Sequence, residues 1–204
     1  MAGNRIALID DHAAVRQALS DLLEVYGYDV VPYESAEAFL ADPARFTIGC
    51  VVSDVRMPGM DGLALLRALV GSGQTTPVPA ILISGQADVP MAVAALKAGA
   101  ADFIEKPVDD LKLVAAINRA MARPPPVAER DLTEIKSRFD RLTPREVNVF
   151  DMVAEGYTSQ SIASNLGISI RTVEGYRAQV MEKLQLTSIA AVVRLAIRLG
   201  RAAP

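Results

Sequence analysis

The first part of the chain alternates between short apolar runs and longer stretches in which apolar residues recur at helical spacing. Short continuous apolar runs are typical of strands that are buried on both faces of a parallel sheet. They predict strands at 5–9, 29–33, 49–53, 79–84 and 101–105. Apolar residues three and four positions apart predict helices at 13–26, 35–41, 61–70, 88–98 and 109–122. This alternation predicts an α/β fold with five parallel strands, wound by helices on both faces.

The pattern changes at three consecutive prolines, Pro124–Pro126, which end the fifth helix and favour a stiff, extended spacer. Beyond them only helical spacing recurs, and it predicts a connecting helix at 132–140 followed by four short helices. These four helices are expected at 143–155, 159–165, 169–184 and 188–200. We therefore expect a first domain at 1–122, a partly helical linker at 123–140 and a small all-α domain at 141–204.

Several helix ends in the second part have side chains that suit capping. Thr143, followed three residues later by Glu146, has the pattern of a capping box, and Ser159 is a second candidate N-cap. Gly156 and Gly167 are candidate C-caps, because glycine adopts the left-handed conformation of that position without a steric penalty. These signals support the division of the second part into separate short helices.

Composition restricts the class of protein. Of the 204 residues 51% are hydrophobic, which is enough for a sizeable core, and no apolar run reaches the ~18 residues of a membrane span. The one cysteine, Cys50, lies inside an apolar run and is typical of a small core residue in a reducing cytoplasm. A single histidine rules out a multi-histidine zinc site.

Charge is distributed unevenly along the chain. Residues 1–121 contain 9 Lys and Arg against 15 Asp and Glu, whereas residues 134–204 contain 10 against 7. An acidic first part favours cations, and a mildly basic second part is compatible with a polyanionic partner.

Polar residues stand where four of the predicted strands end. These residues are Asp10, Asp11, Asp54, Ser84 and Lys106. Because the carboxyl ends of parallel strands share one edge of the sheet, we expect these side chains to lie close together. Crowded carboxylates need a cation, and oxygen ligands in an open site suit Mg²⁺. An aspartate beside a metal ion and a lysine is suited to accept a phosphoryl group.

Each of these residues also has a purely structural interpretation. A lone aspartate at a strand end is more often a cap than a nucleophile, and an Asp-Asp pair after a strand is often only solvated. Ser84 and Gly85 fit an ordinary turn, and Lys106 and Pro107 fit a helix start with proline at the first position. Their coincidence at the ends of four strands of one sheet favours the functional interpretation.

Residues 4–121 closely resemble the receiver domain of two-component response regulators. The resemblance rests on four pieces of sequence, which are IDDH at 9–12, SDVRMPGMDG at 53–62, ISG at 83–85 and KAGAADFIEKP at 97–107. The intervals of thirty residues from Asp54 to Ser84 and twenty-two from Ser84 to Lys106 are also those of the family. The resemblance implies a flavodoxin-like, five-stranded, doubly wound fold.

The resemblance also implies a role for each residue at a strand end. Asp54 would be the phosphoacceptor, and Ser84 and Lys106 would contact the phosphoryl group. Mg²⁺ would be bound by Asp10, Asp11, Asp54 and the backbone carbonyl of Arg56. Phe103 occupies the position of the family's aromatic switch, with an ordinary core phenylalanine as the alternative. The peptide bond before Pro107 is often cis in the family, whereas general frequencies favour trans.

The second part predicts a helix-turn-helix, with two helices joined by LGIS at 166–169. The polar face of the second helix is expected to contact DNA, and the alternative is the solvated face of an ordinary helical bundle. This face consists of Arg171, Thr172, Glu174, Tyr176, Arg177 and Gln179.

The helical stretch is similar to the DNA-binding domain of LuxR-type regulators. The similarity rests on LTPRE at 142–146, AEG at 154–156, the IA and LGIS elements within 162–169, and TVEGYRAQVMEKL at 172–184. Together with this receiver, the stretch looks most like the FixJ-type branch. Three residues, Gln160, Glu174 and Tyr176, replace the lysines and histidine that are common in the family, so the DNA sequence read by relatives cannot be transferred.

These observations predict a cytoplasmic transcriptional response regulator. A sensor histidine kinase would phosphorylate Asp54, and phosphorylation would promote homodimerisation and binding to promoter DNA, with RNA polymerase as a further candidate partner. We expect no enzymatic role beyond the receiver's assistance to its own phosphoryl transfer and dephosphorylation. One alternative is an Mg²⁺-dependent phosphotransferase or phosphatase with Asp54 as its nucleophile. Another is an interaction adaptor that binds no DNA.

Overall fold

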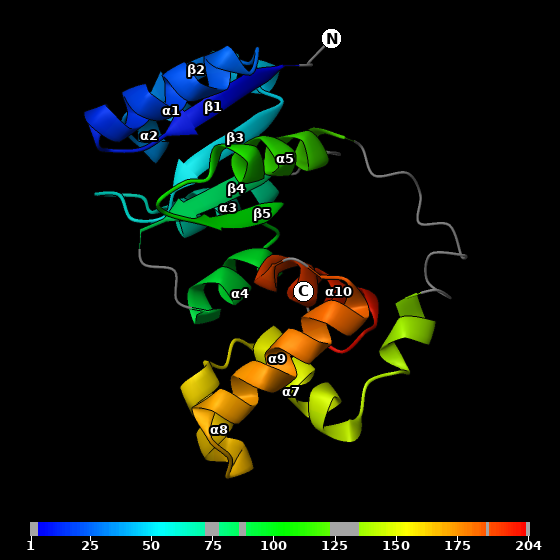
Figure 1. The fold of residues 1–204 in the computed structure, drawn as a ribbon. Helices are drawn as coiled ribbons and strands as arrows, with labels where there is room; N and C mark the ends of the chain where they lie inside the picture. Colours follow the sequence, from blue (N-terminus) through cyan, green and yellow to red (C-terminus); the bar gives the residue numbers. More distant parts are fainter. Residues whose placement is uncertain (1–3, 72–77, 86–88, 123–134, 187, 203–204) are drawn as a thin grey trace. The chain divides into compact units, whose positions relative to one another are not determined.

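The computed structural model describes residues 4–71, 78–85, 89–122, 135–186 and 188–202. The first part of the chain forms a five-stranded parallel sheet with helices, and the described residues after it form helices (Figure 1). Two compact units are distinguished, one of residues 1–87 and 98–123 and the other of residues 88–97 and 124–204. The predicted domain limits at 122 and 140 stay predictions. Within the described ranges, none of the helices has the length and apolar character needed to cross a membrane.

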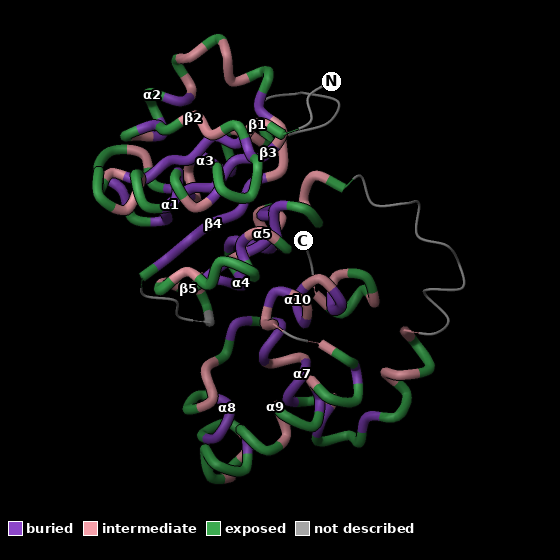
Figure 2. The backbone as a smooth tube through the Cα atoms, turned by 45° about the horizontal axis from the view of Figure 1, so that its top comes forward, coloured by how far each residue is buried: buried purple, intermediate pink, exposed green. Residues whose placement is uncertain are grey.

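The sheet confirms the predicted α/β class. Its strands are β1 (Arg5–Ile9), β2 (Asp29–Tyr33), β3 (Cys50–Asp54), β4 (Ala80–Ser84) and β5 (Asp102–Glu105). They follow the order β2-β1-β3-β4-β5, so that the chain reverses its direction of winding between β1 and β3. Every residue of β3 and β4 is buried, as their continuous apolar runs predict (Figure 2). Pro32 lies in β2 at the edge of the sheet, where a residue without an N–H is tolerated.

Helices of the first unit enclose the sheet. They are α1 (Ala13–Val25), α2 (Ala36–Ala41), α3 (Gly62–Val70) and α5 (Asp110–Met121). Leu23 of α1 and Leu113 of α5 belong to one core cluster with Ile81 of β4, so both helices cover the same face. Helices α2 and α3 lie on the opposite face (Figure 1).

A short 3-10 helix at Pro43–Thr47 was not predicted. Asp42 begins it by accepting a hydrogen bond from the backbone N–H of Ala44 at 2.7 Å. None of its residues is buried. A five-residue element without a buried face produces no hydrophobic periodicity, so the sequence pattern could not reveal it.

The second unit is built from α4 (Val89–Lys97), α7 (Pro144–Glu155), α8 (Ser159–Leu166), α9 (Ile170–Leu184) and α10 (Ile189–Arg198). Residues 135–139 are also helical, within the range predicted for the connecting helix, while 132–134 lie outside the described residues. The core of this unit includes Phe150, Ile162, Val173 and Val180. In this unit α4 packs on α10 and on α7.

Caps define the helix ends of the second unit. The Thr143–Glu146 capping box is present in both directions, and Gly156 and Gly167 adopt the left-handed conformation at the ends of α7 and α8. The predicted N-cap at Ser159 is wrong by one residue. Thr158 has the extended backbone of a cap, with φ −73° and ψ 160°, and its side chain accepts from the N–H of Ser161. Ser159 is already the first helical residue.

Candidate functional site

Strand register brings the predicted site residues to one edge of the sheet. Ile9 pairs with Ser53, and Asp54 pairs with Ile83, so β1, β3 and β4 end at nearly the same level. Asp10 follows Ile9 directly. The strand order reverses between β1 and β3, and ligands of open α/β sheets bind at such a switch point. Asp10 and Asp54 therefore stand where the fold itself favours a binding site.

Lys106 joins the two aspartates of this edge. Its Nζ lies 2.9 Å from Oδ2 of Asp10 and 2.5 Å from Oδ1 of Asp54. Asp10 is 1% exposed and Asp54 is 7% exposed, so bulk water solvates neither carboxylate fully, and each needs a partner within the protein. Burial opposes the charged form of Lys106, but hydrogen bonds to Asp54 and Asp10 outweigh it and raise the pKa of its ammonium group. The lysine is thus a fixed positive charge beside both acids.

The remaining oxygens of the two aspartates accept backbone hydrogen bonds. Oδ2 of Asp54 accepts from the N–H of Arg56 at 2.7 Å, and Oδ1 of Asp10 accepts from the N–H of His12 at 2.9 Å. Asp54 is therefore held from one side by Lys106 and from the other by the loop that follows β3. An aspartate that only ended a strand would not need a half-buried lysine from another strand end as its partner.

Asp10, Asp11 and His12 form a group of possible metal ligands. Each offers an atom, and these atoms lie within 4.8 Å of one another. His12 Nδ1 lies 2.9 Å from Oδ1 of Asp11, and the ring is exposed. The two carboxylates are hard oxygen donors of the kind that Mg²⁺ prefers. Our sequence prediction did not include His12, and its place directly after the two aspartates is the only signal that could have suggested it.

Ser84 and Pro107 lie at the same edge, and Phe103 lies within the neighbouring strand β5. Ser84 ends β4 and is 1% exposed, and its backbone carbonyl accepts from the N–H of Lys106 at 2.8 Å. Phe103 lies in β5 and is half-buried. The Lys106–Pro107 peptide bond is cis. The structure therefore brings Asp10, Asp54, Ser84 and Lys106 together, with Phe103 in the strand that precedes Lys106.

In the second unit, α8 and α9 form the predicted helix-turn-helix pair. Gly167 ends α8 in the left-handed conformation, and Ser169 begins α9 by accepting from the N–H of Thr172. Val173 and Val180 face the core, which leaves the polar positions of α9 on the outside. Exposed residues of the predicted DNA-binding face are Arg171, Thr172, Glu174 and Gln179, while Tyr176 and Arg177 are half-buried.

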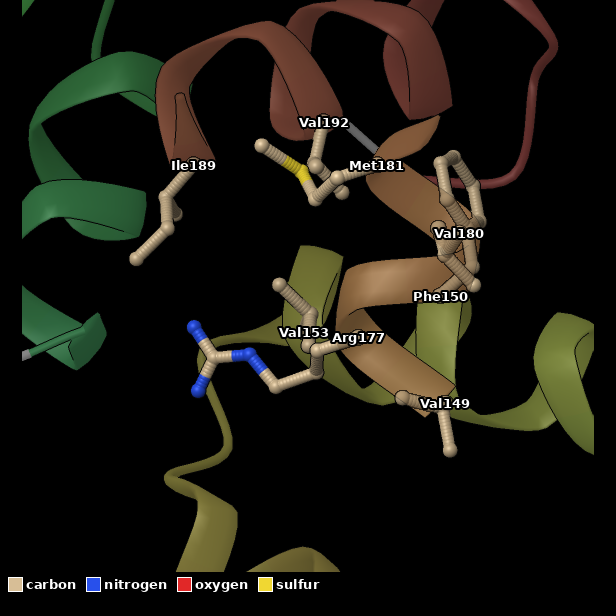
Figure 3. Close-up of a pocket in the computed structure, with 8 residues that line it drawn as sticks. All are labelled: Val149, Phe150, Val153, Arg177, Val180, Met181, Ile189 and Val192. Carbon is tan, nitrogen blue, oxygen red and sulfur yellow. The ribbon is translucent and has the colours of Figure 1, made fainter. Parts of the chain in front are cut away.

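Arg177 makes a contact that the sequence did not suggest. Its Nη1 donates to Oγ of Ser159, at the start of α8, at 2.6 Å. Figure 3 shows the guanidinium group at the edge of a small, apolar cavity of about 70 Å³, which is lined by residues of α7, α9 and α10. Arg177 therefore links the two helices of the pair. A nucleic acid that used Arg177 would have to share or replace this hydrogen bond.

An ion pair between a buried carboxylate and an exposed lysine connects the other end of α9 to α7. Lys183 donates to both carboxylate oxygens of Glu146, at 2.7 and 2.8 Å, and Glu146 is 2% exposed. Burial opposes ionisation of Glu146, but hydrogen bonds from Lys183 and Thr143 outweigh it and lower the pKa of the carboxyl group. The sequence suggested the cap at Glu146 but not its partner thirty-seven residues away.

Comparisons with known proteins assign a family to each part of the chain. The response regulator receiver domain family matches residues 6–118, and the family described as bacterial regulatory proteins, luxR family, matches residues 140–196. The transcriptional regulatory protein FixJ of Bradyrhizobium diazoefficiens is 43% identical over 197 residues, 96% of this chain and 95% of that protein. The tetrathionate response regulatory protein TtrR of Salmonella typhimurium is 41% identical over 189 residues, 93% of this chain and 90% of that protein.

Solved structures give the same result. Full-length FixJ from B. japonicum aligns with a TM-score of 0.53 at 42% identity, covering 98% of each chain. The structure of FixJ-N aligns with a TM-score of 0.54 at 42% identity, covering 62% of this chain and 100% of that one.

The sheet-edge acids, the helix-turn-helix pair and the matched families define a response regulator with a DNA-binding domain. The chain belongs to this family and is a transcriptional response regulator of the FixJ type, with a receiver domain followed by a LuxR-type domain. Membership implies a histidine kinase and promoter DNA as partners. A phosphotransferase or phosphatase is not favoured, because relatives that match almost the whole chain are transcriptional regulators.

Proposed function

We propose that Asp54 is the phosphoacceptor and that a sensor histidine kinase is its phosphodonor. The observation that supports this most is the position of the Asp54 carboxylate between Lys106 and the N–H of Arg56 at the switch point of the sheet. The carboxylate is supported by the buried strand β3, yet it stands at the strand's open end. A nucleophile needs both properties, a fixed position and access to the donor.

Each residue of the edge has a task in this reaction. An oxygen of Asp54 attacks the phosphorus atom, the bond from phosphorus to the donor atom breaks, and the leaving group retains its electron pair. The ammonium of Lys106 neutralises charge on the transferred group, and the hydroxyl of Ser84 donates to one of its oxygens. Phosphorylation would then rearrange Ser84 and Phe103, which belong to a two-state element whose equilibrium depends on the local charge.

Magnesium is the metal that the donor set fits. Asp10, Asp11, Asp54 and the backbone carbonyl of Arg56 would hold the ion, which supplies positive charge to the phosphoryl oxygens. His12 would support the site through its contacts with Asp10 and Asp11. Lys106 supplies one positive charge to the two carboxylates of Asp10 and Asp54, and the ion would balance the negative charge that remains.

Phosphorylation would act on DNA binding through dimerisation. Helix α9 would enter the major groove with Arg171, Thr172, Glu174, Tyr176, Arg177 and Gln179 toward bases and phosphates. The second part has only a small excess of positive charge, so a monomer would bind weakly and two linked monomers far more tightly. In the cytoplasm, a symmetric homodimer would bind a promoter DNA site with two-fold symmetry. RNA polymerase would be a further partner of the dimer at that promoter.

The assignment of Asp54 is tested by Asp54→Asn, which keeps the shape of the side chain and removes its nucleophilic oxygen. Labelling by acetyl phosphate with Mg²⁺ should fall to background. Asp21→Asn, an exposed position on α1, is the matched control and should label normally. Undiminished labelling of Asp54→Asn would refute the assignment.

The same assay separates a regulator from an enzyme that uses Asp54 for turnover. A regulator accumulates phosphorylated Asp54, up to about one phosphoryl group per chain, because its own dephosphorylation is slower than its labelling. A phosphatase or phosphotransferase would release product steadily while little phosphorylated Asp54 accumulates. Steady release without accumulation of phosphorylated Asp54 would favour the enzymatic alternative.

A further inference from the structure

The loop between β3 and α3 is attached to a helix that lies far from it in sequence. This loop, residues 55–61, begins directly after Asp54 and ends where α3 starts at Gly62. The backbone N–H of Met60 donates to Oε1 of Glu37, in the first turn of α2, at 2.7 Å. Glu37 is an exposed residue, so this hydrogen bond is not a consequence of core packing.

The position and the ionisation of the Glu37 side chain both favour this hydrogen bond. Ser35 caps α2 by accepting from the N–H of Ala38 at 3.1 Å, which fixes the turn that holds Glu37. Hydrogen bonds from its own backbone N–H, from Met60 and from Ser35 lower the pKa of the Glu37 carboxyl group. The group is therefore ionised at neutral pH, and an ionised acceptor makes a stronger hydrogen bond than a neutral one.

Gly59 shows how closely the loop approaches the carboxylate. It adopts φ +76°, and a Cβ at this position would lie 2.6 Å from Oε1 of Glu37. The left-handed backbone therefore favours glycine here, and a larger residue would also displace the carboxylate of Glu37 from its present position. The loop and the side chain of Glu37 are fitted to each other, which a solvated surface glutamate would not need.

The loop is the part of the chain that holds the outer side of Asp54. At its start the N–H of Arg56 donates to Oδ2 of Asp54, and at its end Asp61 caps α3. A Cβ on Gly62 would lie 2.4 Å from the backbone oxygen of Asp54, so the end of the loop returns to the residue at which it began. Between these two points, Glu37 holds the tip of the loop through its hydrogen bond with Met60.

We propose that Glu37 is a positioning residue of the phosphorylation site, which holds loop 55–61 so that the backbone of Arg56 stays beside Asp54. This inference rests on the proposed function of Asp54 and adds a residue outside the reacting groups. The tether reduces the freedom of the loop and so preserves both the N–H of Arg56 for Asp54 and its carbonyl for the metal ion. Glu37 touches neither the phosphoryl group nor the metal.

The test compares Glu37→Ala and Glu37→Gln in the full chain, with Glu34→Gln as the control. Glu34 is an exposed acid three residues earlier, so its replacement by glutamine changes the net charge of the same segment equally. Two measurements need no phosphodonor, namely hydrogen exchange of the Met60 amide and calorimetric titration with Mg²⁺. Labelling by acetyl phosphate is then measured as a function of Mg²⁺ concentration.

Glu37→Ala should accelerate exchange at Met60 about tenfold, the effect of losing one hydrogen bond to a charged group. It should also weaken Mg²⁺ binding and shift labelling to higher Mg²⁺ concentration by about tenfold, with smaller changes at saturating Mg²⁺. Glu37→Gln retains an oxygen acceptor and should restore most of both properties, and Glu34→Gln should match the wild type. Faster exchange with unchanged Mg²⁺ binding and labelling would overturn the proposal, and so would unchanged exchange.

A second pair of variants tests the contact between the loop and Glu37 by changing Gly59 of the loop. Gly59→Ala is made in the wild type and in Glu37→Ala, so that the backbone strain at φ +76° is common to both and cancels. The alanine should weaken Mg²⁺ binding more when Glu37 is present, because only then does its Cβ meet the carboxylate. Equal effects in the two backgrounds would overturn the proposal. Labelling of Asp54→Asn would instead refute the proposed function and leave the exchange result at Met60 unaffected.

Discussion

The two sites of this protein place their charged residues in opposite ways. At the sheet edge Asp10 and Asp54 are mostly buried, and Lys106 contacts both carboxylates. On α9 the residues expected to contact DNA are mostly exposed, and so is Lys183, which pairs with the buried Glu146 of α7 apart from the predicted reading face. The first site keeps its acidic groups inside the fold, whereas the second keeps its recognition residues outside.

This difference follows from what each site has to do. Transfer of a phosphoryl group requires a few atoms at fixed positions in surroundings that water does not screen. Recognition of DNA requires many side chains that reach outward, each of which contributes a little. Single substitutions should therefore have large and metal-dependent effects at the sheet edge and small, sequence-dependent effects on α9.

The largest effect is expected for Lys106→Met. Loss of the ammonium leaves two buried carboxylates side by side without a counter-charge, which should lower the stability of the receiver by about 3 kcal/mol. Added Mg²⁺ should recover part of this loss, because it supplies the missing positive charge. Hydrogen exchange of the β3 and β4 amides measures the change, with the exposed Lys112→Met of α5 as control. A loss that Mg²⁺ does not reduce would place the metal site elsewhere.

Glu146→Gln should cost about 2 kcal/mol in the second unit at neutral pH, since it removes a charged hydrogen-bond acceptor of Lys183. The pKa of Glu146 in the folded protein lies below its ordinary value of 4.5. Its stabilisation is therefore complete above that value and is lost as the pH falls through the folded-state pKa. Hydrogen exchange of α7 and α9 at decreasing pH should show this loss in the wild type.

The corresponding pH dependence should be weaker in Glu146→Gln, because glutamine does not titrate in this range. Added Mg²⁺ should leave both proteins unchanged, in contrast to the result expected for Lys106→Met. An equally steep acid loss in the variant would show that other carboxylates of the second unit cause it.

Asp11→Ala should weaken Mg²⁺ binding by at least about tenfold, because even supporting groups of metal sites contribute that much. Calorimetric titration without a phosphodonor measures the affinity directly. Asp21→Ala, an exposed acid on α1, serves as the control for the change of net charge. If the double variant of Asp10 and Asp11 to alanine binds Mg²⁺ as the wild type does, these aspartates are not the ligands.

The smallest effect is expected for Glu174→Ala, in the middle of the reading face. If Glu174 accepts a hydrogen bond from a base, the variant should lose preference at one base pair by about 1 kcal/mol. If Glu174 points to solvent, the variant should bind every sequence slightly more tightly, because one repulsive charge is absent. Selection on randomised sites distinguishes these outcomes, with Glu182→Ala on the same helix as control. The same selected motif for both variants and the wild type would exclude base readout by Glu174.

The positions of the residues at the sheet edge could be predicted because each depends only on the strand that precedes it. Each strand is a short apolar run, parallel strands end at one edge, and the residue after each run therefore has a known place. Asp10 and Asp54 could be assigned to that edge without any knowledge of packing. Helix positions in the second part were predicted for the same reason, because a 3.6-residue period fixes which residues face inward.

Contacts that polar side chains make with groups far away in the sequence could not be predicted in this way. The pairs Lys183–Glu146, Arg177–Ser159 and Glu37–Met60 depend on how far one element is shifted along another. Hydrophobic periodicity defines the inward face of an element but not this shift, and the side chains involved are common on any protein surface. The cap at Thr158 was missed by one residue, because two adjacent hydroxyl residues offer the same chemistry to the helix start.

Pro32 has a consequence for how this protein can associate. An edge strand usually offers a row of N–H groups to which a strand of another molecule can add, and such addition leads to aggregation as easily as to assembly. The edge strand β2 has only five residues, one of which has no N–H to offer, and the opposite edge strand β5 has only four. Extension of the sheet from one chain to the next is therefore disfavoured at both edges. If this protein pairs on phosphorylation, as we propose, it can do so through side chains of its helices without the risk of growing a continuous sheet.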